Sequence, residues 1–275
     1  MSLVFGPAGV PLSSKERSTI GGIEEVARLG LSAMELEFVR GVRMSEAMAQ
    51  SVNSISKKLN VQLTVHAPYF INLNSKEKAK YEASIKRILD SARIGYIAGA
   101  SSCTFHPAYY GSDDPKTVYT RVKDALKRIL EQLDKENIKI SIRPETTGKP
   151  SQFGTLEEIL QLSTDLPGIK PCVDFAHIYA RNTGKYNTEE EFAKMLEMIK
   201  SQLGDDALKD MHIHLSGIVY TEKGEKNHTT LSESDFNWQG VLRVLKDFNA
   251  GGIVISESPI LEKDALLMQK FYNEL

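Results

Sequence analysis

Histidine and carboxylate residues recur where the apolar segments of this chain end. Each segment reads as a short buried run or alternates apolar and polar residues at the two-residue period of a β-strand. The residues at or just beyond the segment ends are His66, His106, Glu145, Asp174, His214 and Glu257, and His177 and His228 follow in the next loops. Imidazole and carboxylate groups together are typical zinc ligands, and manganese or iron also accepts them.

One histidine at a strand end is more often a hydrogen-bonded polar residue than a ligand. Here, however, five of the six histidines of the chain fall at or just beyond predicted strand ends, at one predicted rim. Three carboxylates crowded at the same place would repel one another unless cations neutralised them. The pattern therefore predicts a metal centre.

Strand-like segments alternate with helical patterns along the chain. Strands are expected at residues 4–5, 34–38, 61–66, 102–106, 138–142, 170–174, 211–215 and 252–257. Helices are expected at residues 14–29, 44–58, 75–98, 115–133, 155 onward, 188–203, 238–248 and 261–275. Such alternation implies parallel βαβ units, and eight units imply an α/β fold with one (β/α)8 TIM-barrel domain over residues 1–275. An open doubly wound sheet is the competing fold, but no glycine fingerprint of the dinucleotide-binding type follows the first strand.

Composition limits the class of protein. The 275 residues have a net charge of −2, so no overall basic field indicates nucleic acid, although bound cations would change the sign at a local site. The two cysteines imply no disulfide framework. With no signal peptide and no apolar run long enough to span a bilayer, we expect a cytoplasmic protein that does not contact membranes.

His212 and His214 lie two residues apart and therefore face the same side of their strand. We choose His214 as the ligand because it lies nearer the strand end. His212 is expected in the barrel interior, behind the ligands.

Together, these segments resemble endonuclease IV, a family of metal-dependent apurinic/apyrimidinic (AP) endonucleases with a (β/α)8 barrel. The similarity covers essentially the whole chain. It is carried by His66 with Tyr69-Phe70-Ile71-Asn72-Leu73, by Phe105-His106-Pro107, by Glu145-Thr146-Thr147-Gly148, by Val173-Asp174-Phe175-Ala176-His177, by His214-Leu215 and by Ser256-Glu257-Ser258-Pro259. Each piece alone is weak, whereas their joint spacing is specific.

The resemblance implies a role for each ligand. A first ion would be held by His66, His106 and Glu145, a second by Glu145, Asp174, His214 and Glu257, and a third site would include His177 and His228. Two ions about 3.5–4 Å apart can share a bridging hydroxide, which would attack the phosphodiester as the nucleophile. The implied activity is hydrolysis 5′ to abasic sites during base excision DNA repair, with zinc as cofactor and Glu145 as the central catalytic residue.

The resemblance also implies the partner, which is double-stranded DNA with abasic or blocked 3′ lesions, and we expect the protein to act as a monomer. Tyr69 and Phe70 would enter the DNA at the lesion, where extruding an abasic nucleotide costs less than extruding a paired base. Arg40 and Arg43, in the loop after residues 34–38, are candidates for the same DNA-facing surface. The alternative is that the rings only cover the barrel mouth and that the arginines are solvated loop charges.

The chain departs from the family pattern at one position. Endonuclease IV has an aspartate two residues before the histidine that matches His228, whereas this chain has Lys226. Because an ammonium group cannot ligate a cation, we expect a weak third site, with Lys226 contacting the scissile phosphate. Alternatively, Glu225 or Glu222 supplies the missing carboxylate.

Two other functions fit parts of this pattern. A single-metal sugar or sugar-phosphate isomerase or epimerase of the xylose-isomerase-like barrels would need only Glu145, Asp174, His214 and Glu257. His66, His106 and the aromatic pair are what favour the nuclease. The second alternative is a metal-dependent DNA-binding module without turnover.

Overall fold

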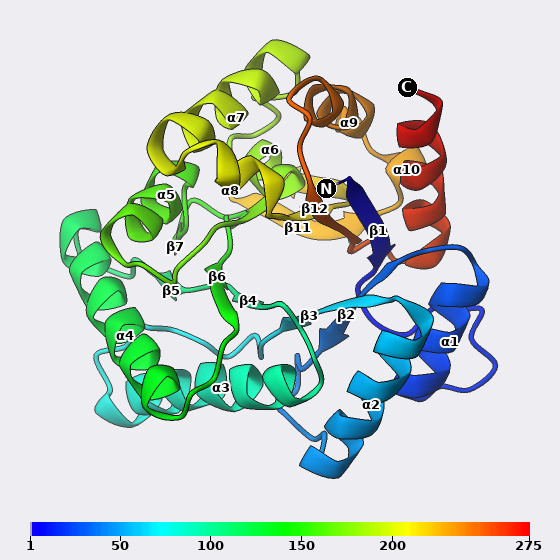
Figure 1. The fold of residues 1–275 in the computed structure, drawn as a ribbon. Coiled ribbons are helices and arrows are strands. Elements are labelled where there is room, and N and C mark those ends of the chain that lie inside the picture. Colours follow the sequence, from blue (N-terminus) through cyan, green and yellow to red (C-terminus); the bar gives the residue numbers. More distant parts are fainter. Residues whose placement is uncertain (1) are drawn as a thin grey trace.

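Eight parallel strands close into a barrel (Figure 1). The computed structural model describes residues 2–275, so Met1, the first residue of the predicted domain, lies outside the described residues. The barrel strands are β1 (Leu3–Pro7), β2 (Ala33–Glu37), β3 (Gln62–His66), β4 (Ser102–Phe105), β6 (Ser141–Pro144), β8 (Cys172–Asp174), β9 (Met211–Leu215) and β12 (Gly252–Ser256). Two parallel sheets, β1-β12-β9-β8 and β2-β3-β4-β6, are joined by the bridges Ala8–Glu35, Ile142–Ile169 and Glu145–Cys172. The predicted TIM-barrel fold is confirmed.

Eight helices of ten or more residues surround the barrel (Figure 1). They are α1 (Thr19–Arg28), α2 (Glu46–Leu59), α3 (Lys78–Ile97), α4 (Pro115–Lys135), α5 (Leu156–Asp165), α7 (Glu189–Leu203), α9 (Trp238–Asp247) and α10 (Glu262–Glu274). Capping boxes begin α5 at Thr155 and α7 at Thr188, as serine or threonine followed by glutamate three residues later predicts. Each helix buries an apolar face, such as Ile85 and Ile88 of α3, against the strands.

Some predicted boundaries are wrong. Helix α1 begins at Thr19 instead of residue 14, because Ser18 accepts the capping bond from Gly21 N–H while the Ser14 hydroxyl donates to a backbone carbonyl. The fifth barrel strand begins at Ser141 instead of residue 138, because Ile138 N–H still closes the end of α4 on Leu133. Pro171, which has no N–H, shortens the sixth strand to Cys172–Asp174. Helix α3 begins at Lys78 instead of residue 75.

Additional short elements lie in the loops that follow the barrel strands. They are the pair β5 (Ala108–Tyr109) and β7 (Gln152–Phe153), helix α6 (Phe175–Arg181), the hairpin β10 (Gly217–Thr221) and β11 (Gly224–Thr229), and the 3₁₀ helix η1 (Leu231–Glu233). A further short helix, α8 (Asp205–Lys209), precedes β9. None of these was predicted. Among residues 2–275, no helix combines the length and apolarity needed to cross a bilayer.

Candidate metal centre

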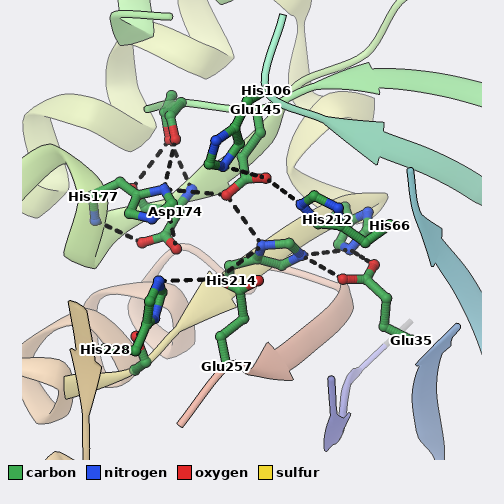
Figure 2. A network of polar contacts seen from close by, with 12 residues as sticks. Glu35, His66, His106, Glu145, Asp174, His177, His212, His214, His228 and Glu257 are labelled. Atoms are coloured by element: carbon green, nitrogen blue, oxygen red, sulfur yellow. Dashed lines mark hydrogen bonds and ion pairs between the residues drawn. The ribbon is translucent and has the colours of Figure 1, made fainter. Parts of the chain in front are cut away.

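The predicted ligand side chains meet at the carboxyl ends of the barrel strands (Figure 2). His66 and Asp174 are the last residues of β3 and β8, and His106, Glu145 and Glu257 directly follow β4, β6 and β12. The remaining three are His214 on β9, His177 on α6 and His228 on β11. The barrel therefore brings all eight predicted ligands to one place, as ends of parallel strands do.

Glu145 is the centre of this arrangement. Its Oε2 lies 3.3 Å from His66 Nε2 and 3.4 Å from His106 Nε2. Its Oε1 lies 3.2 Å from His177 Nδ1 and 3.3 Å from His214 Nδ1. One fully buried carboxylate thus presents one oxygen to His66 and His106 and the other to His177 and His214.

Ligand atoms gather in three groups at the rim, each with all of its atoms within 4.8 Å of one another. The groups are His66, His106 and Glu145; Glu145, Asp174, His214 and Glu257; and His177, His228 and Glu257. The first two match the two ion sites that the resemblance implies, with Glu145 in both. The third contains both histidines expected there and adds Glu257.

Asp174 shows how local structure aims these groups. Its Oδ1 caps helix α6 by accepting a hydrogen bond of 2.7 Å from His177 N–H, which leaves Oδ2 facing the centre. The cap also fixes His177 one turn into α6, where its Nδ1 lies 3.5 Å from Asp174 Oδ2. A single strand-to-helix junction therefore delivers two ligands.

Several buried polar atoms at the centre have no hydrogen-bond partner. Within residues 2–275, Asp174 Oδ2, Glu257 Oε2, His177 Nε2, Glu35 Oε1 and Glu37 Oε1 are all unpartnered. An unpaired buried polar atom costs about 1–3 kcal/mol, so folded proteins rarely leave such atoms together. Cations bound among these oxygens and nitrogens would supply the missing partners, and the residues present therefore fit metal ions.

Burial and mutual interaction shift the pKa values of these groups. Burial alone would lower the pKa of His66, but Glu145 and the neighbouring acids raise it to about 10. Burial raises the pKa of Asp174 to about 8, and burial with nearby acids raises that of Glu37 to about 8. Protons thus neutralise part of the cluster, and bound cations would displace them because ligands coordinate in their deprotonated form.

The hairpin β10–β11 places the carboxylate of Glu225 near the predicted ligands. The aspartate of endonuclease IV would stand one position later, at Lys226. Across the hairpin, Val219 pairs with Asn227 and Tyr220 pairs with Glu225, so Lys226 is an unpaired bulge residue. A bulge reverses the alternation of side chains, and Glu225 and His228 consequently face the same side. Glu225 Oε2 lies 3.7 Å from His177 Nε2, and its Oε1 lies 3.8 Å from His228 Nε2.

Two other residues of the hairpin were predicted to contact phosphate or to bind metal. Lys226 and Glu222 are both exposed. The carboxylate between the two histidines is therefore Glu225, one of the two alternatives predicted from the sequence. Gly148 makes room for it, since a Cβ at that position would lie 2.6 Å from Glu225 Cβ.

The aromatic pair after β3 is solvent-exposed. Tyr69 is 58% exposed and Phe70 is 73% exposed. The Tyr69 ring packs edge-on against His66 with ring centroids 5.7 Å apart, and Arg87 Nη1 donates to the Phe70 carbonyl. The loop is thus anchored while its rings remain accessible beside a predicted ligand.

Basic residues around the mouth fall into two kinds. Arg40 and Arg43 are exposed and line a groove of about 520 Å³ after β2. Arg181 instead donates from Nη1 to the carbonyl oxygens of Lys149 and Gln152. Its charge therefore holds the loop after β6 in place.

Sequence reasoning missed two acids, Glu35 and Glu37 of β2, which face the same cluster. Glu35 is fully buried and contacts His212 and His214. The signal was present, because both acids lie two residues apart within a predicted strand, where charged side chains are unusual. His212 lies in the barrel interior, as predicted.

The chain forms a closed (β/α)8 barrel with imidazole and carboxylate groups at its strand ends that could hold metal ions. Residues 23–274 match the family model described as the xylose isomerase-like TIM barrel. This chain belongs to that family.

Comparison with individual proteins adds detail. An uncharacterised protein of Methanocaldococcus jannaschii is 46% identical over 273 residues, which are 99% of this chain and 98% of that protein. A probable endonuclease 4 of Oceanobacillus iheyensis is 28% identical over 158 residues, or 55% of this chain and 51% of that protein. The resemblance to endonuclease IV is thereby confirmed.

Solved structures agree on the fold. Endonuclease IV from Thermus thermophilus superposes with a TM-score of 0.75 at 21% identity, covering 98% of this chain and all of that one (100%). A D-tagatose 3-epimerase-like protein superposes with a TM-score of 0.74 at 20% identity, covering 100% of this chain and 96% of that one. At these identities the structures share the fold, and the two names point to different chemistries.

Proposed function

We propose that this protein is a metal-dependent AP endonuclease that hydrolyses the phosphodiester 5′ to abasic sites in double-stranded DNA. The observation that carries the proposal is the shared carboxylate, because Glu145 belongs to two separate ligand groups at the rim. A site for one ion, built from Glu145, Asp174, His214 and Glu257, would not need His66 and His106. Those two histidines lie beside the other oxygen of Glu145, Oε2. A pair of ion sites with a common ligand suits phosphoryl chemistry.

The donor set favours zinc, since three or four nitrogen and carboxylate ligands per ion are its usual environment. Bound in this way, two divalent ions would activate water at neutral pH and neutralise the charge that develops on the phosphate. The role of the chain is to fix the ligands before the ions arrive. Glu145 is fully buried and Asp174 is held by the α6 cap, so neither carboxylate has to be ordered on binding.

The third ligand group is also complete in this proposal. Glu225 replaces the family aspartate, so His177, His228 and Glu225 would hold a third ion, with Glu257 adjacent to His228 at 3.9 Å. We therefore propose a third site with Glu225 as its carboxylate, in place of the weak third site expected from the sequence. Lys226, exposed on the same hairpin, would then contact DNA phosphate as a surface cation.

The DNA-facing surface follows from exposure and charge. Tyr69 and Phe70 project accessible rings beside His66, where they would fill the gap left by a missing base. Arg40 and Arg43 line the adjoining groove and would contact backbone phosphates, which position DNA without reading its sequence. Selectivity would come from the low cost of extruding a nucleotide that lacks a base.

The test is incubation of purified, zinc-loaded protein with a duplex that carries one abasic site and an end label. We expect a nick 5′ to the site, its loss with chelator and its return when zinc is restored. An undamaged duplex of the same sequence is the control. Tight binding without a nick would instead indicate a DNA-binding module.

The runner-up is a single-metal sugar epimerase, which the D-tagatose 3-epimerase-like neighbour favours. It would depend on Glu145, Asp174, His214 and Glu257 but not on His66. The variant His66→Gln separates the two functions, since it should reduce DNA cleavage and leave any epimerisation of ketoses intact. Ketose epimerisation by a protein that does not cleave abasic DNA would overturn our proposal.

A further inference from the structure

A second cluster of ligand-type atoms lies beside His214, where Glu35 and His212 meet it (Figure 2), and His212 stands two residues earlier on β9 than His214. Glu35 Oε1 lies 3.1 Å from His214 Nε2, and Glu35 Oε2 lies 3.1 Å from His212 Nε2. The two Nε2 atoms are 3.2 Å apart. All three side chains are at most 2% exposed.

The spacing of these atoms resembles the coordination shell of one ion. Zinc bonds nitrogen and oxygen at about 2.0–2.1 Å in tetrahedral geometry, which places neighbouring ligand atoms about 3.3 Å apart. Hydrogen bonding leaves the group incomplete, because buried Glu35 Oε1 has no hydrogen-bond partner. Thr64 donates to Glu35 Oε2 at 2.7 Å and so anchors only the other oxygen.

A hydrogen bond with Ser102 also fixes the orientation of the His212 ring. Its Nδ1 lies 3.1 Å from Ser102 Oγ, and with the proton on Nδ1 the ring donates to that hydroxyl. Its Nε2 then presents a lone pair toward Glu35. Ligand histidines in metal sites are commonly held in this way through their other nitrogen.

A fourth ligand comes from the neighbouring strand. Cys172 pairs in register with His212 across β8 and β9, and the ligand atoms of Cys172, His212 and His214 lie within 4.8 Å of one another. Cys172 joins the two histidines from one side and Glu35 contacts both of them from another, so an ion among them would have a sulfur, two imidazoles and a carboxylate, the four-ligand set of a closed zinc site. Such a site has no open position for substrate and is therefore structural.

We propose that Glu35, Cys172, His212 and His214 form an additional, buried divalent-cation site that takes zinc beneath the rim centre. His214 links the two layers, because its Nδ1 lies 3.3 Å from Glu145 Oε1 while its Nε2 faces Glu35. With an ion on each nitrogen, this ring would give up its second proton to solvent. The inner ion would neutralise a carboxylate and a thiolate that are otherwise buried, and it would fix the orientation of His214 toward the rim.

The test uses the full chain and cobalt as the probe ion, because cobalt bound to a thiolate gives a sulfur-to-cobalt charge-transfer band. We expect the wild-type protein loaded with cobalt to show this band and the Cys172→Ser variant to lose it. Glu145→Gln, which disrupts the rim, should keep the band. This readout does not depend on DNA cleavage, so it stands or fails separately from the proposed function.

Metal counting gives a second measurement. After zinc loading, Glu35→Gln should hold one ion fewer per chain than wild type. Glu25→Gln is the matched control, since it makes the same change at a buried glutamate of α1 whose carboxylate contacts Ser13 and Arg28 instead of the cluster, and it should leave the count unchanged. A wild-type protein without the sulfur–cobalt band, or equal zinc counts in wild type and Glu35→Gln, would overturn the proposal and reduce the cluster to a hydrogen-bonded support for His214.

Discussion

The two ends of the barrel both bury charge, but they treat it differently. Near the amino-terminal ends of β8 and β9, the buried Arg143 guanidinium donates to the carbonyl oxygens of Pro171 and Asp210 and to Asp210 Oδ2, at 2.9–3.0 Å. Lys170 adds a second cation on Asp210. At the carboxyl ends, Asp174 Oδ2 and Glu257 Oε2 are buried without a hydrogen-bond partner. At the first end the chain itself pairs the guanidinium through both of its terminal nitrogens and leaves Arg143 Nε without a partner, whereas our proposed function has cations pair the carboxylates at the second end.

We expect the largest effect from removing the carboxylate of Glu145, which two ligand groups share at the carboxyl ends of the strands. Glu145→Gln should lower abasic-site cleavage by more than about 100-fold, because even the loss of a residue that only supports a ligand costs about 10–100-fold. Zinc content should fall as well. Steady-state cleavage and elemental analysis on the same preparation check both, and a variant with wild-type zinc and activity would refute the assignment of Glu145.

The double variant Tyr69→Ala with Phe70→Ala should weaken binding to abasic DNA while zinc content stays the same. Aromatic stacking contributes about 1–3 kcal/mol per base, so loss of both rings should raise the Kd by at least tenfold. Titration with labelled duplex measures this. Wild-type cleavage at subsaturating DNA would show that the rings only cover the mouth.

Glu225→Gln should weaken the binding of one zinc ion, because His177 and His228 lose one of the two carboxylates beside them and keep only Glu257. The matched control is Lys226→Gln, a change at the adjacent bulge residue that should preserve metal binding and reduce only the affinity for DNA. Competition with a chelator measures the loss of zinc. Equal zinc retention in the two variants would mean that Glu225 is not a ligand.

At the amino-terminal end of the barrel, Arg143→Met should lower the free energy of unfolding by about 1–3 kcal/mol, since it leaves a buried carbonyl without its donor. The rim ions should be retained, because the hydrogen bonds of Arg143 go to Pro171 and Asp210 and not to the rim ligands. Urea denaturation of the zinc-loaded protein gives the difference. A variant that lost zinc but kept its free energy of unfolding would contradict this structural role of Arg143.

The smallest effect concerns pH in the metal-free protein. His66 has a pKa raised from 6.5 to about 10, so its stabilising contribution is complete below pH 6.5 and is lost as pH rises toward 10. The raised pKa of Glu37, from 4.5 to about 8, acts with the same sign. Chelated protein should therefore be less stable at pH 9 than at pH 7, and zinc-loaded protein should show less of this decline. Higher stability of the chelated protein at pH 9 would contradict these shifts.

Much of the barrel and rim follows from local sequence signals. Strand and helix periodicity predicted the eight repeated units, and strand ends predicted where His66 and Glu145 meet. The bulge that aims Glu225 was not predictable, since it depends on which residue of β11 is left unpaired by β10. Glu35 was missed for a different reason: its partners, His212 and His214, are distant in sequence and become neighbours only when the barrel closes.

The bulge at Lys226 also lets the ligand-facing carboxylate and the exposed positive charge occupy different positions of β11. In an unbroken strand, the residue two before His228 faces the ligands, and an ammonium there would compete with a cation. The unpaired residue shifts the alternation by one position, so the carboxylate of Glu225 faces the two histidines while the positive charge of Lys226 is exposed. In the proposed function, the hairpin would attract a polyanion on its outer side and hold a metal ion on its inner side, and changes at position 226 would alter the first affinity without altering the second.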